Sequence, residues 1–457
     1  MSNASGSISN TSIMNSIEKR AASSLASLYA LRMLGLFMVL PVMMEEGQKL
    51  EGATVSLLGL AMGIYGLTQA LLQIPAGTLS DRFGRKPIII GGLIIFAIGS
   101  LIAASADTIW MMLLGRALQG AGAIASAIMA LLTDLTREEH RMKAMATVGV
   151  SIGLSFSVAL VLGPWLATLG GLPLIFGLTA ALAIAGVFVV LFAIPTPPKQ
   201  THRDSMAVWS EVLVQVRNRE LWPLNTGIFL LHALMVAIFV AIPKELSTLG
   251  VAAEYRSWVY LPTLLVAFVL MVPFIIIAEK KKHMKGVVIS GAGIIALSLL
   301  MMVAANELWH WVVAMMLYFW GFNLMEASLP SWLSKVAPAG AKGSAMGVYS
   351  TMQFLGAFMG GGIGGWLYSQ YGSDQLFLAF AVLIVIWLLL LLRSPAPKYL
   401  TSVRLDASTG CNETQLAQLK ALAGVAEVNL LSEEGAVYLK VNADTFDYQR
   451  ASAIIQA

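Results

Sequence analysis

Charged residues, cysteine and histidine are all scarce in this chain of 457 residues. Asp, Glu, Lys and Arg together make up 12% of it, about half the share in soluble proteins. This scarcity excludes a soluble enzyme, a disordered chain and a nucleic-acid-binding protein that relies on phosphate contacts. The single cysteine, Cys411, excludes an internal disulfide framework and a cysteine-rich metal site. We therefore expect no metal, no cofactor and no nucleic acid partner.

Hydrophobic residues are abundant instead, at 58% of the chain, as expected for a polytopic α-helical protein embedded in a lipid bilayer. Residues 1–20 are rich in Ser and Asn, and we predict a disordered tail without a cleaved signal peptide. We place twelve membrane spans, at residues 22–44, 55–79, 87–105, 108–133, 144–166, 172–194, 221–243, 257–278, 286–305, 309–333, 344–367 and 374–392.

Lys and Arg are distributed unevenly between the loops that these spans create. The loops on one side hold eighteen of them, and those on the other side hold three. Positive residues collect in cytoplasmic loops, so we predict a multi-pass protein of the cell's inner membrane with both termini in the cytoplasm. The same rule accounts for the net charge of +4 without a nucleic acid partner.

The spans divide into two six-helix halves, residues 21–194 and 221–392, which repeat weakly at a period near 200 residues. The run beginning at Lys143 resembles the run beginning at Lys342. Two halves of the same orientation imply a parallel repeat with a substrate site near the midplane between them.

The loop between the halves, residues 195–220, starts with prolines and becomes polar. Its second part places Trp209, Val212, Leu213 and Val216 at helical spacing, which predicts an amphipathic helix on the inner membrane surface. A plain linker is the alternative.

Residues 393–400 form a second linker, and residues 401–457 have the pattern of a soluble domain. Their predicted element order is strand, helix, strand, strand, helix, which is a small α+β ferredoxin-like fold without its last strand. The domain has four basic and seven acidic side chains, whereas the inner loops are basic. We therefore expect intramolecular docking of this domain on the cytoplasmic loops. A lone cysteine in place of a C-x-x-C pair argues against metal carriage.

The loop between spans two and three reads Gly77-Thr-Leu-Ser-Asp81-Arg82-Phe-Gly84-Arg85-Lys86. It resembles motif A of the major facilitator superfamily, G-x-L-x-D-R-x-G-R-K, at every defining position. Its glycines are expected to permit a tight turn. The resemblance implies that Arg85 pairs with Asp134 at the end of span four and that Asp81 faces the start of span eleven, near residues 343–345. In the family these contacts hold the outward-facing state; a solvated basic loop is the alternative.

Spans four and five extend the resemblance. Span four reads Leu113-Leu-Gly-Arg116-Ala-Leu-Gln-Gly-Ala-Gly, which resembles motif B with Arg116 as a buried cation; an arginine that reaches an interface is the alternative. Span five carries a stretched and partial form of the antiporter motif C, formed by Gly149, Gly153, Gly163 and Pro164. The Gly-Gly pair expected after the proline is absent at that spacing, which weakens the inference of antiport over symport.

Few ionisable residues lie within the spans. Glu326 in span ten is our first candidate for proton coupling, because an acid at membrane depth must be neutral or paired. Arg32 in span one is a plausible partner across the cavity, and a structural ion pair is the alternative. His232 in span seven is either a relay or a satisfied interior histidine. Asn323 and Gln353 could bind a substrate through hydrogen bonds.

Together these features imply a major facilitator fold of the drug:proton antiporter type. Such a protein is a secondary transporter that uses the proton gradient to export small lipophilic or drug-like molecules by alternating access. No Walker A motif is present, which disfavours an ATP-driven pump. The alternative is a membrane sensor or uniporter that is regulated through its C-terminal domain.

Overall fold

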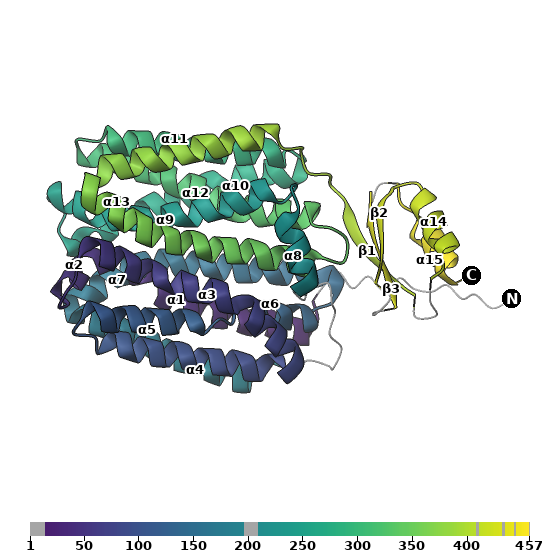
Figure 1. The fold of residues 1–457 in the computed structure, drawn as a ribbon, viewed down its shortest axis with the longest axis horizontal. Helices are drawn as coiled ribbons and strands as arrows, with labels where there is room; N and C mark the ends of the chain where they lie inside the picture. Colours follow the sequence, from purple (N-terminus) through teal and green to yellow (C-terminus); the bar gives the residue numbers. More distant parts are fainter. Residues whose placement is uncertain (1–13, 196–208, 408–410, 432–434, 443–444, 457) are drawn as a thin grey trace.

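The structure is a computed structural model, and it describes residues 14–195, 209–407, 411–431, 435–442 and 445–456. A bundle of long helices carries a small domain at one end (Figure 1). We call the end of the bundle beside this domain the domain end, and the opposite end the distal end. Parts of the predicted tail and of the linker between the halves, residues 1–13 and 196–208, lie outside the described residues.

The first half forms the purple and blue layer of the bundle in Figure 1. Its elements are α1 (Ser16–Phe37), α2 (Met43–Glu46), η1 (Gly47–Lys49), α3 (Val55–Phe83), α4 (Arg85–Ala104), α5 (Ile109–Ala121), α6 (Ala125–Asp134), α7 (Glu138–Phe188) and the π-helical turn η2 (Val189–Ala193). A capping box formed by Asn15 and Glu18 starts α1. This helix therefore includes residues 16–20, which we had assigned to the disordered tail.

The second half forms the teal and green layer. Its elements are α9 (Trp222–Thr248), η4 (Ala253–Tyr255), α10 (Ser257–Lys280), α11 (Met284–Val303), α12 (Leu308–Val336) and α13 (Lys342–Arg393). The backbones of α3 and α13 approach closely where the halves meet, because Gly59 and Gly361 face each other. A Cβ atom on either glycine would lie 2.4 Å from the other's carbonyl oxygen.

Nine segments of the described chain are long and apolar enough to cross a membrane. Two of them, α7 and α13, contain 51 and 52 residues, and each is interrupted by a glycine with positive φ, at Gly171 and Gly372. Each therefore supplies two of the predicted spans. With α1 added, the described residues contain all twelve. Span four is broken into α5 and α6 at residues 122–124.

The short helix α8 (Trp209–Arg217) lies across the domain end (Figure 1). Its Val212 is buried against Ile74 and Val348, which come from different halves. Leu213 and Val216 are exposed instead, so the predicted apolar stripe is divided between the protein and its surroundings. The side chain of Trp209 lies outside the described residues.

The C-terminal domain has the predicted order: β1 (Thr401–Asp406), α14 (Glu413–Ala421), β2 (Val425–Leu431), β3 (Ala436–Val441) and α15 (Tyr448–Gln456). Its antiparallel sheet has the strand order β1-β3-β2. Every second residue of β3, namely Val437, Leu439 and Val441, packs in the same core as Leu419 and Ile455 of the helices. The ferredoxin-like α+β fold is thus confirmed, and the opposite face of the sheet is left for other contacts.

Candidate transport site

Three helices of the second half bring Glu326, His232 and Gln353 together. The sequence offered these residues as separate candidates and did not predict that they meet. The Gln353 amide nitrogen lies 3.3 Å from Glu326 Oε1 and 2.8 Å from His232 Nε2. His232 Nδ1 lies 3.3 Å from the carbonyl oxygen of Ile228, and its Nε2 lies 3.8 Å from Glu326 Oε2. A neutral His232 that donates from Nδ1 and accepts from Gln353 at Nε2 satisfies this geometry.

Glu326 lies near the middle of α12, yet 37% of its side-chain surface is accessible. Its Oε2 atom has no hydrogen-bond partner, and neither do Asn323 Nδ2 and the buried hydroxyls of Tyr318 and Tyr349. Both tyrosines lie within electrostatic range of the Glu326 carboxylate. Buried polar groups are normally hydrogen-bonded, so this cluster can accept water, a proton or a polar group of a ligand.

Arg32 is not the ion-pair partner of Glu326 in the described structure, which corrects our expectation. Its Nη2 atom donates within the first half, to Tyr65 Oη at 2.8 Å, Gln69 Oε1 at 2.7 Å and the carbonyl oxygen of Gly122 at 3.3 Å. The break in span four frees that carbonyl group, and α3 supplies the other two oxygens. Neutral oxygens therefore hold this cation, while its Nε and Nη1 atoms have no partner.

Arg116 is buried, as motif B implied, and the alternative of an interfacial arginine is wrong. Its guanidinium donates to the carbonyl oxygens of Ala61 and Met62, at 3.1 and 3.4 Å, and to Gln119 Oε1 at 2.7 Å. It also lies over the ring of Tyr65, 5.5 Å from the centroid. The first half thus holds two cations, Arg32 and Arg116, by neutral groups.

At the domain end, Arg85 binds two carboxylates. Its Nε atom lies 3.0 Å from Asp134 Oδ2, and its Nη1 atom binds Asp81 and, at 2.7 Å, Ser80 Oγ. The predicted pair of Arg85 and Asp134 is therefore present, and both side chains are almost fully buried. The recorded bonds of Asp81 go to Arg85, and its approach to residues 343–345 stays a prediction.

The other motif A residues have distinct places. Gly84, with φ of +96°, makes the turn between α3 and α4, but Gly77 lies inside α3, where a Cβ would meet Ser126 Oγ at 3.2 Å. Our expectation of two turn glycines is thus right for one of them. Lys86 donates to the carbonyl oxygen of Ile194 at 2.7 Å, and Arg82 is exposed.

The glycines of the partial motif C differ in their surroundings. A Cβ on Gly163, which precedes Pro164, would lie 2.2 Å from the carbonyl oxygen of Met38. A Cβ on Gly153 would touch the ring of Phe268 in the other half at 3.3 Å, and Gly149 has open space around it. Only Gly163 therefore marks a close approach of two backbones.

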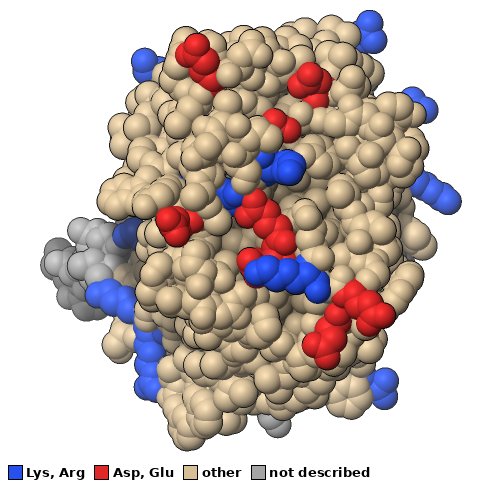
Figure 2. Space-filling model, turned by 90° about the vertical axis from the view of Figure 1, so that its left-hand side faces the viewer, with Lys and Arg blue, Asp and Glu red and all other residues tan. Residues whose placement is uncertain are grey.

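An ion pair at the distal end joins the halves, and our sequence reasoning missed it. Arg256 binds Glu45 through both terminal nitrogens, at 2.5 and 2.6 Å, and also binds Ser247 Oγ at 2.8 Å. Arg256 is 2% exposed. Figure 2 looks onto this end and shows acidic and basic side chains side by side near its middle. Several acids and three bases lie in the outer loops, and nothing in the sequence singles out Glu45 and Arg256 as a pair.

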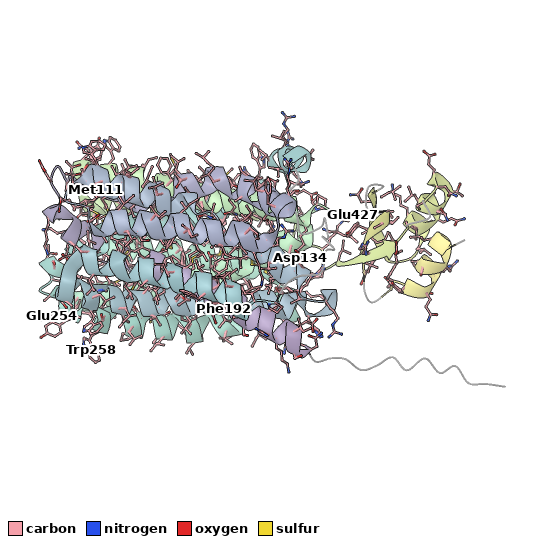
Figure 3. The ribbon with its side chains drawn as sticks, turned by 90° about the horizontal axis from the view of Figure 1, so that it is seen from below. Met111, Asp134, Phe192, Glu254, Trp258 and Glu427 are labelled. Carbon is pink, nitrogen blue, oxygen red and sulfur yellow. The ribbon has the colours of Figure 1, made fainter. Side chains whose placement is uncertain are left out.

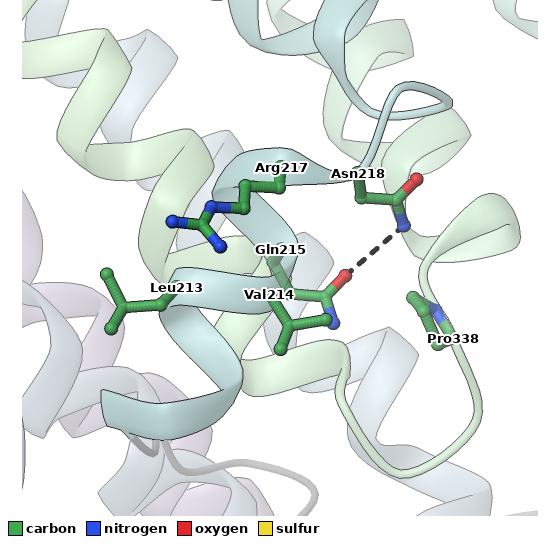
Figure 4. Close-up of a pocket in the computed structure, with 6 residues that line it drawn as sticks. All are labelled: Leu213, Val214, Gln215, Arg217, Asn218 and Pro338. Carbon is green, nitrogen blue, oxygen red and sulfur yellow. Dashed lines mark hydrogen bonds between the residues drawn. The ribbon is translucent and has the colours of Figure 1, made fainter.

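A pocket of about 460 Å³ opens at the domain end between α8 and the loop after α12. Figure 4 shows the residues that line it: Leu213, Val214, Gln215, Arg217, Asn218 and Pro338. None of the predicted site residues lines this pocket. The geometry therefore favours the cluster around Glu326 as the candidate transport site.

Comparisons with the sequences and structures of known proteins are consistent with this architecture. A family model described as Major Facilitator Superfamily matches residues 22–361. The chain is also 46% identical over 450 residues to the inner membrane transport protein YajR of Escherichia coli (strain K12), covering 96% of this chain and 98% of YajR. The chain belongs to the major facilitator superfamily. It is accordingly a multi-pass membrane protein and a secondary transporter, not an enzyme.

Other similar proteins are more distant from this chain. The multidrug resistance protein MdtH of Aeromonas salmonicida (strain A449) is 25% identical over 346 residues, which cover 75% of this chain and 86% of MdtH. A bacterial homolog of the human lysosomal transporter Spinster, solved in an inward-facing and occupied conformation, is 14% identical with a TM-score of 0.68, covering 84% and 98% of the two chains. A D-xylose-proton symporter is 15% identical with a TM-score of 0.64, covering 82% and 98%. The two solved structures show the shared fold.

Proposed function

We propose that this protein couples proton movement to the export of small lipophilic or drug-like molecules, with Glu326 as the proton site. One observation carries the proposal. Near the middle of a span, Glu326 has a side chain that is 37% accessible and an Oε2 atom that is buried without a hydrogen-bond partner. No Lys or Arg of the described chain forms an ion pair with it. A carboxylate in this setting is costly as an anion, so it exchanges protons readily. His232 and Gln353 position it, and Asn323 and the two tyrosines offer polar contacts to a substrate.

The names of similar proteins support the substrate class, the energy source and the membrane of the proposal. MdtH is named as a multidrug resistance protein, and one structural neighbour is a proton symporter. YajR is named as an inner membrane protein, which supports the same membrane for this chain. The basic loops at the domain end support a cytoplasmic position for that end and for both termini.

Alternating access requires contacts that hold each end of the bundle closed in turn. The recorded contacts of Arg85 with its two carboxylates lie within the first half and do not join it to the second. Glu45 and Arg256 join the two halves at the distal end. We propose that the pair at the distal end separates whenever that end opens, because its two residues belong to different halves.

The test uses purified protein in proteoliposomes that contain an internal pH dye. Tetraphenylphosphonium and D-xylose are added as probes of the lipophilic-cation and sugar classes. We expect one probe class to drive proton movement, and Glu326→Gln to reduce that movement at least tenfold. Glu254→Gln, at an exposed acid of the distal end, is the matched control and should transport normally.

Proton movement in Glu326→Gln at the wild-type rate would contradict the proton role of Glu326. Movement of a probe without any proton movement would instead favour a uniporter, and binding without movement would favour a sensor.

A further inference from the structure

The second half has its own ion-pair network at the domain end, although it lacks motif A. Lys335 Nζ lies 2.9 Å from Glu279 Oε2 and 2.8 Å from Ser331 Oγ, and Ser331 also binds Glu279. We call these three residues the Glu279 network. It joins the ends of α10 and α12, as Arg85 joins the ends of α3 and α6. Lys285 donates to the carbonyl oxygens of Leu392 and Ser394 near the end of α13, at 3.0 and 2.6 Å, much as Lys86 does near the end of η2.

The two networks differ in how they are covered. Arg85 and Asp134 expose 4% and 3% of their side chains, whereas Lys335 and Glu279 expose 16% and 41%. The first half buries its network by itself. The network of the second half is partly exposed, and residues that follow span twelve contact it.

Tyr399, in the linker after α13, is the first of these residues along the chain to contact the Glu279 network. Its ring lies 5.6 Å from Lys335 Nζ, within range of a cation–π interaction. Its hydroxyl donates to the carbonyl oxygen of Ala278 at 3.1 Å and accepts from the amide of Met284 at 3.0 Å. Tyr399 therefore links the end of α10, the start of α11 and the side chain at the end of α12.

The free face of the C-terminal sheet supplies the remaining contacts. We call it the outer sheet face, formed by Glu427, Asn429, Ala436, Tyr438 and Lys440. Figure 3 shows Glu427 on the side of the domain that is turned towards the helices. Lys440 donates to the carbonyl oxygen of Lys335 at 2.8 Å, where a cation complements the negative end of α12.

The same face binds the loop between α12 and α13 at one residue. Asn429 donates to the carbonyl oxygen of Ala339 at 2.9 Å, and the amide of Ala339 donates to Glu427 at 3.4 Å. Ala436 and Tyr438 pack against the Ala339 side chain. These hydrogen bonds go to backbone groups of the loop. The opposite net charges of the domain and the inner loops, on which we based the expectation of docking, do not predict such bonds.

Burial distinguishes this arrangement from a loose contact. Lysine is almost never fully buried unless it is paired, yet Lys440 is 3% exposed and Tyr438 is 4% exposed. On an isolated three-stranded domain, both side chains would project from the sheet into water. The outer sheet face is therefore shaped for an interface.

We propose that the C-terminal domain is a clamp for the second half. Through Tyr399 and the outer sheet face, it completes the Glu279 network and holds together the domain ends of α10, α11 and α12. Because α12 carries Glu326 and the clamped loop leads into the helix of Gln353, the clamp acts on the two helices of the candidate transport site. The contacts themselves do not depend on the proposed proton coupling.

The test measures backbone hydrogen–deuterium exchange in the full-length protein in nanodiscs, without substrate or a proton gradient. We expect Lys440→Ala to raise exchange in residues 335–341 about tenfold, the effect of losing one charge-assisted hydrogen bond from a protected segment. Tyr399→Ala should raise exchange around Met284 similarly, and Tyr399→Phe, which keeps the ring, should raise it less. Exchange in the first-half loop, residues 81–86, should stay unchanged in all three variants.

Lys420→Ala is the matched control, because Lys420 is an exposed lysine of α14 in the same domain. Unchanged exchange in residues 335–341 of Lys440→Ala, or an equal rise in Lys420→Ala, would overturn the clamp. A global rise that includes residues 81–86 would do the same, since it would show general unfolding. Failure of the proton-transport experiment would leave these outcomes unaffected.

Discussion

The two six-helix halves share their helix arrangement but place their buried charges in opposite ways. The first half holds two cations, Arg32 and Arg116, with carbonyl, amide and hydroxyl oxygens, and leaves each 1% exposed. The second half holds an acid, Glu326, whose side chain is 37% accessible and whose Oε2 atom is buried without a hydrogen-bond partner. Repetition of a fold therefore fixes where helices lie, whereas the side chains decide which charges each half holds and with which partners.

The domain ends differ in the same manner. In the first half, Arg85 binds two carboxylates that come from helices of the same half. In the second half, the Glu279 network stays partly exposed with the C-terminal domain in place, and Tyr399 and Lys440 contact its Lys335. The first arrangement is self-contained, and the second can be changed from outside the membrane domain.

The largest effect is expected from a substitution that removes the ion pairs of Arg85 with Asp81 and Asp134. Arg85→Ala leaves the carboxylates of Asp81 and Asp134 in a buried site without a cation, and we expect a loss of about 3–5 kcal/mol in unfolding free energy. Lys335→Ala removes the partner of Glu279, whose side chain is already 41% accessible to water. We therefore expect a loss of only about 0.5 kcal/mol in unfolding free energy. Thermal unfolding in detergent, followed by tryptophan fluorescence, measures both. Arg82→Ala, at the exposed neighbour, is the control, and equal losses for Arg85 and Lys335 would remove the contrast between the halves.

A smaller effect compares the glycine-rich span of each half. In Gly361→Ala, the new methyl group lies 2.4 Å from Gly59 O and 2.7 Å from the amide nitrogen of Gly63. We expect about 1–3 kcal/mol of destabilisation, because α3 and α13 must separate. Gly149→Ala in span five meets open space, and we expect a gain of up to about 1 kcal/mol from helix propensity. The same unfolding assay distinguishes them, and a neutral Gly361→Ala would show that the halves do not meet at this contact.

The smallest effect concerns pH at the domain end. Two hydrogen bonds from the Arg137 side chain, at 2.9 and 3.0 Å, lower the pKa of Glu18 from its ordinary 4.5 to about 2. This pair therefore stabilises the folded state above pH 4.5, and its contribution is lost as the pH falls towards 2. Glu18→Gln should lower stability at pH 7 by about 1 kcal/mol and remove part of the loss between pH 4.5 and 3.

Lys285→Gln provides the second-half comparison for that experiment. Lys285 binds carbonyl oxygens, which do not titrate, so this variant should keep the wild-type dependence on pH in the same window. An acid sensitivity in Glu18→Gln that matches the wild type would mean that other carboxylates dominate this range.

The sequence predicted the spans, the halves, the ferredoxin-like order and the pair of Arg85 and Asp134. Hydropathy and turn residues are local properties. The pair of Arg85 and Asp134, which spans three and four separate in the chain, was implied by the resemblance to the major facilitator superfamily. The sequence identified Glu326, His232 and Gln353 as separate candidates but did not predict that they form a cluster. Its members lie on three helices, and no pattern in the chain states which faces of those helices meet.

By itself, the sequence determined that this protein has twelve membrane spans, because long apolar runs cross a bilayer as helices that satisfy their own backbone polar groups. It indicated a transporter only through its resemblance to the major facilitator superfamily. Tertiary structure alone decided the partners of the other buried charges. Arg32 binds Gln69 and Gly122 rather than Glu326, Arg256 crosses to Glu45, and Lys440 reaches the end of α12. Each choice depends on which groups are brought within about 3 Å by segments far apart in the chain, where hydrogen bonds are strong and the cost of an unpaired charge is highest.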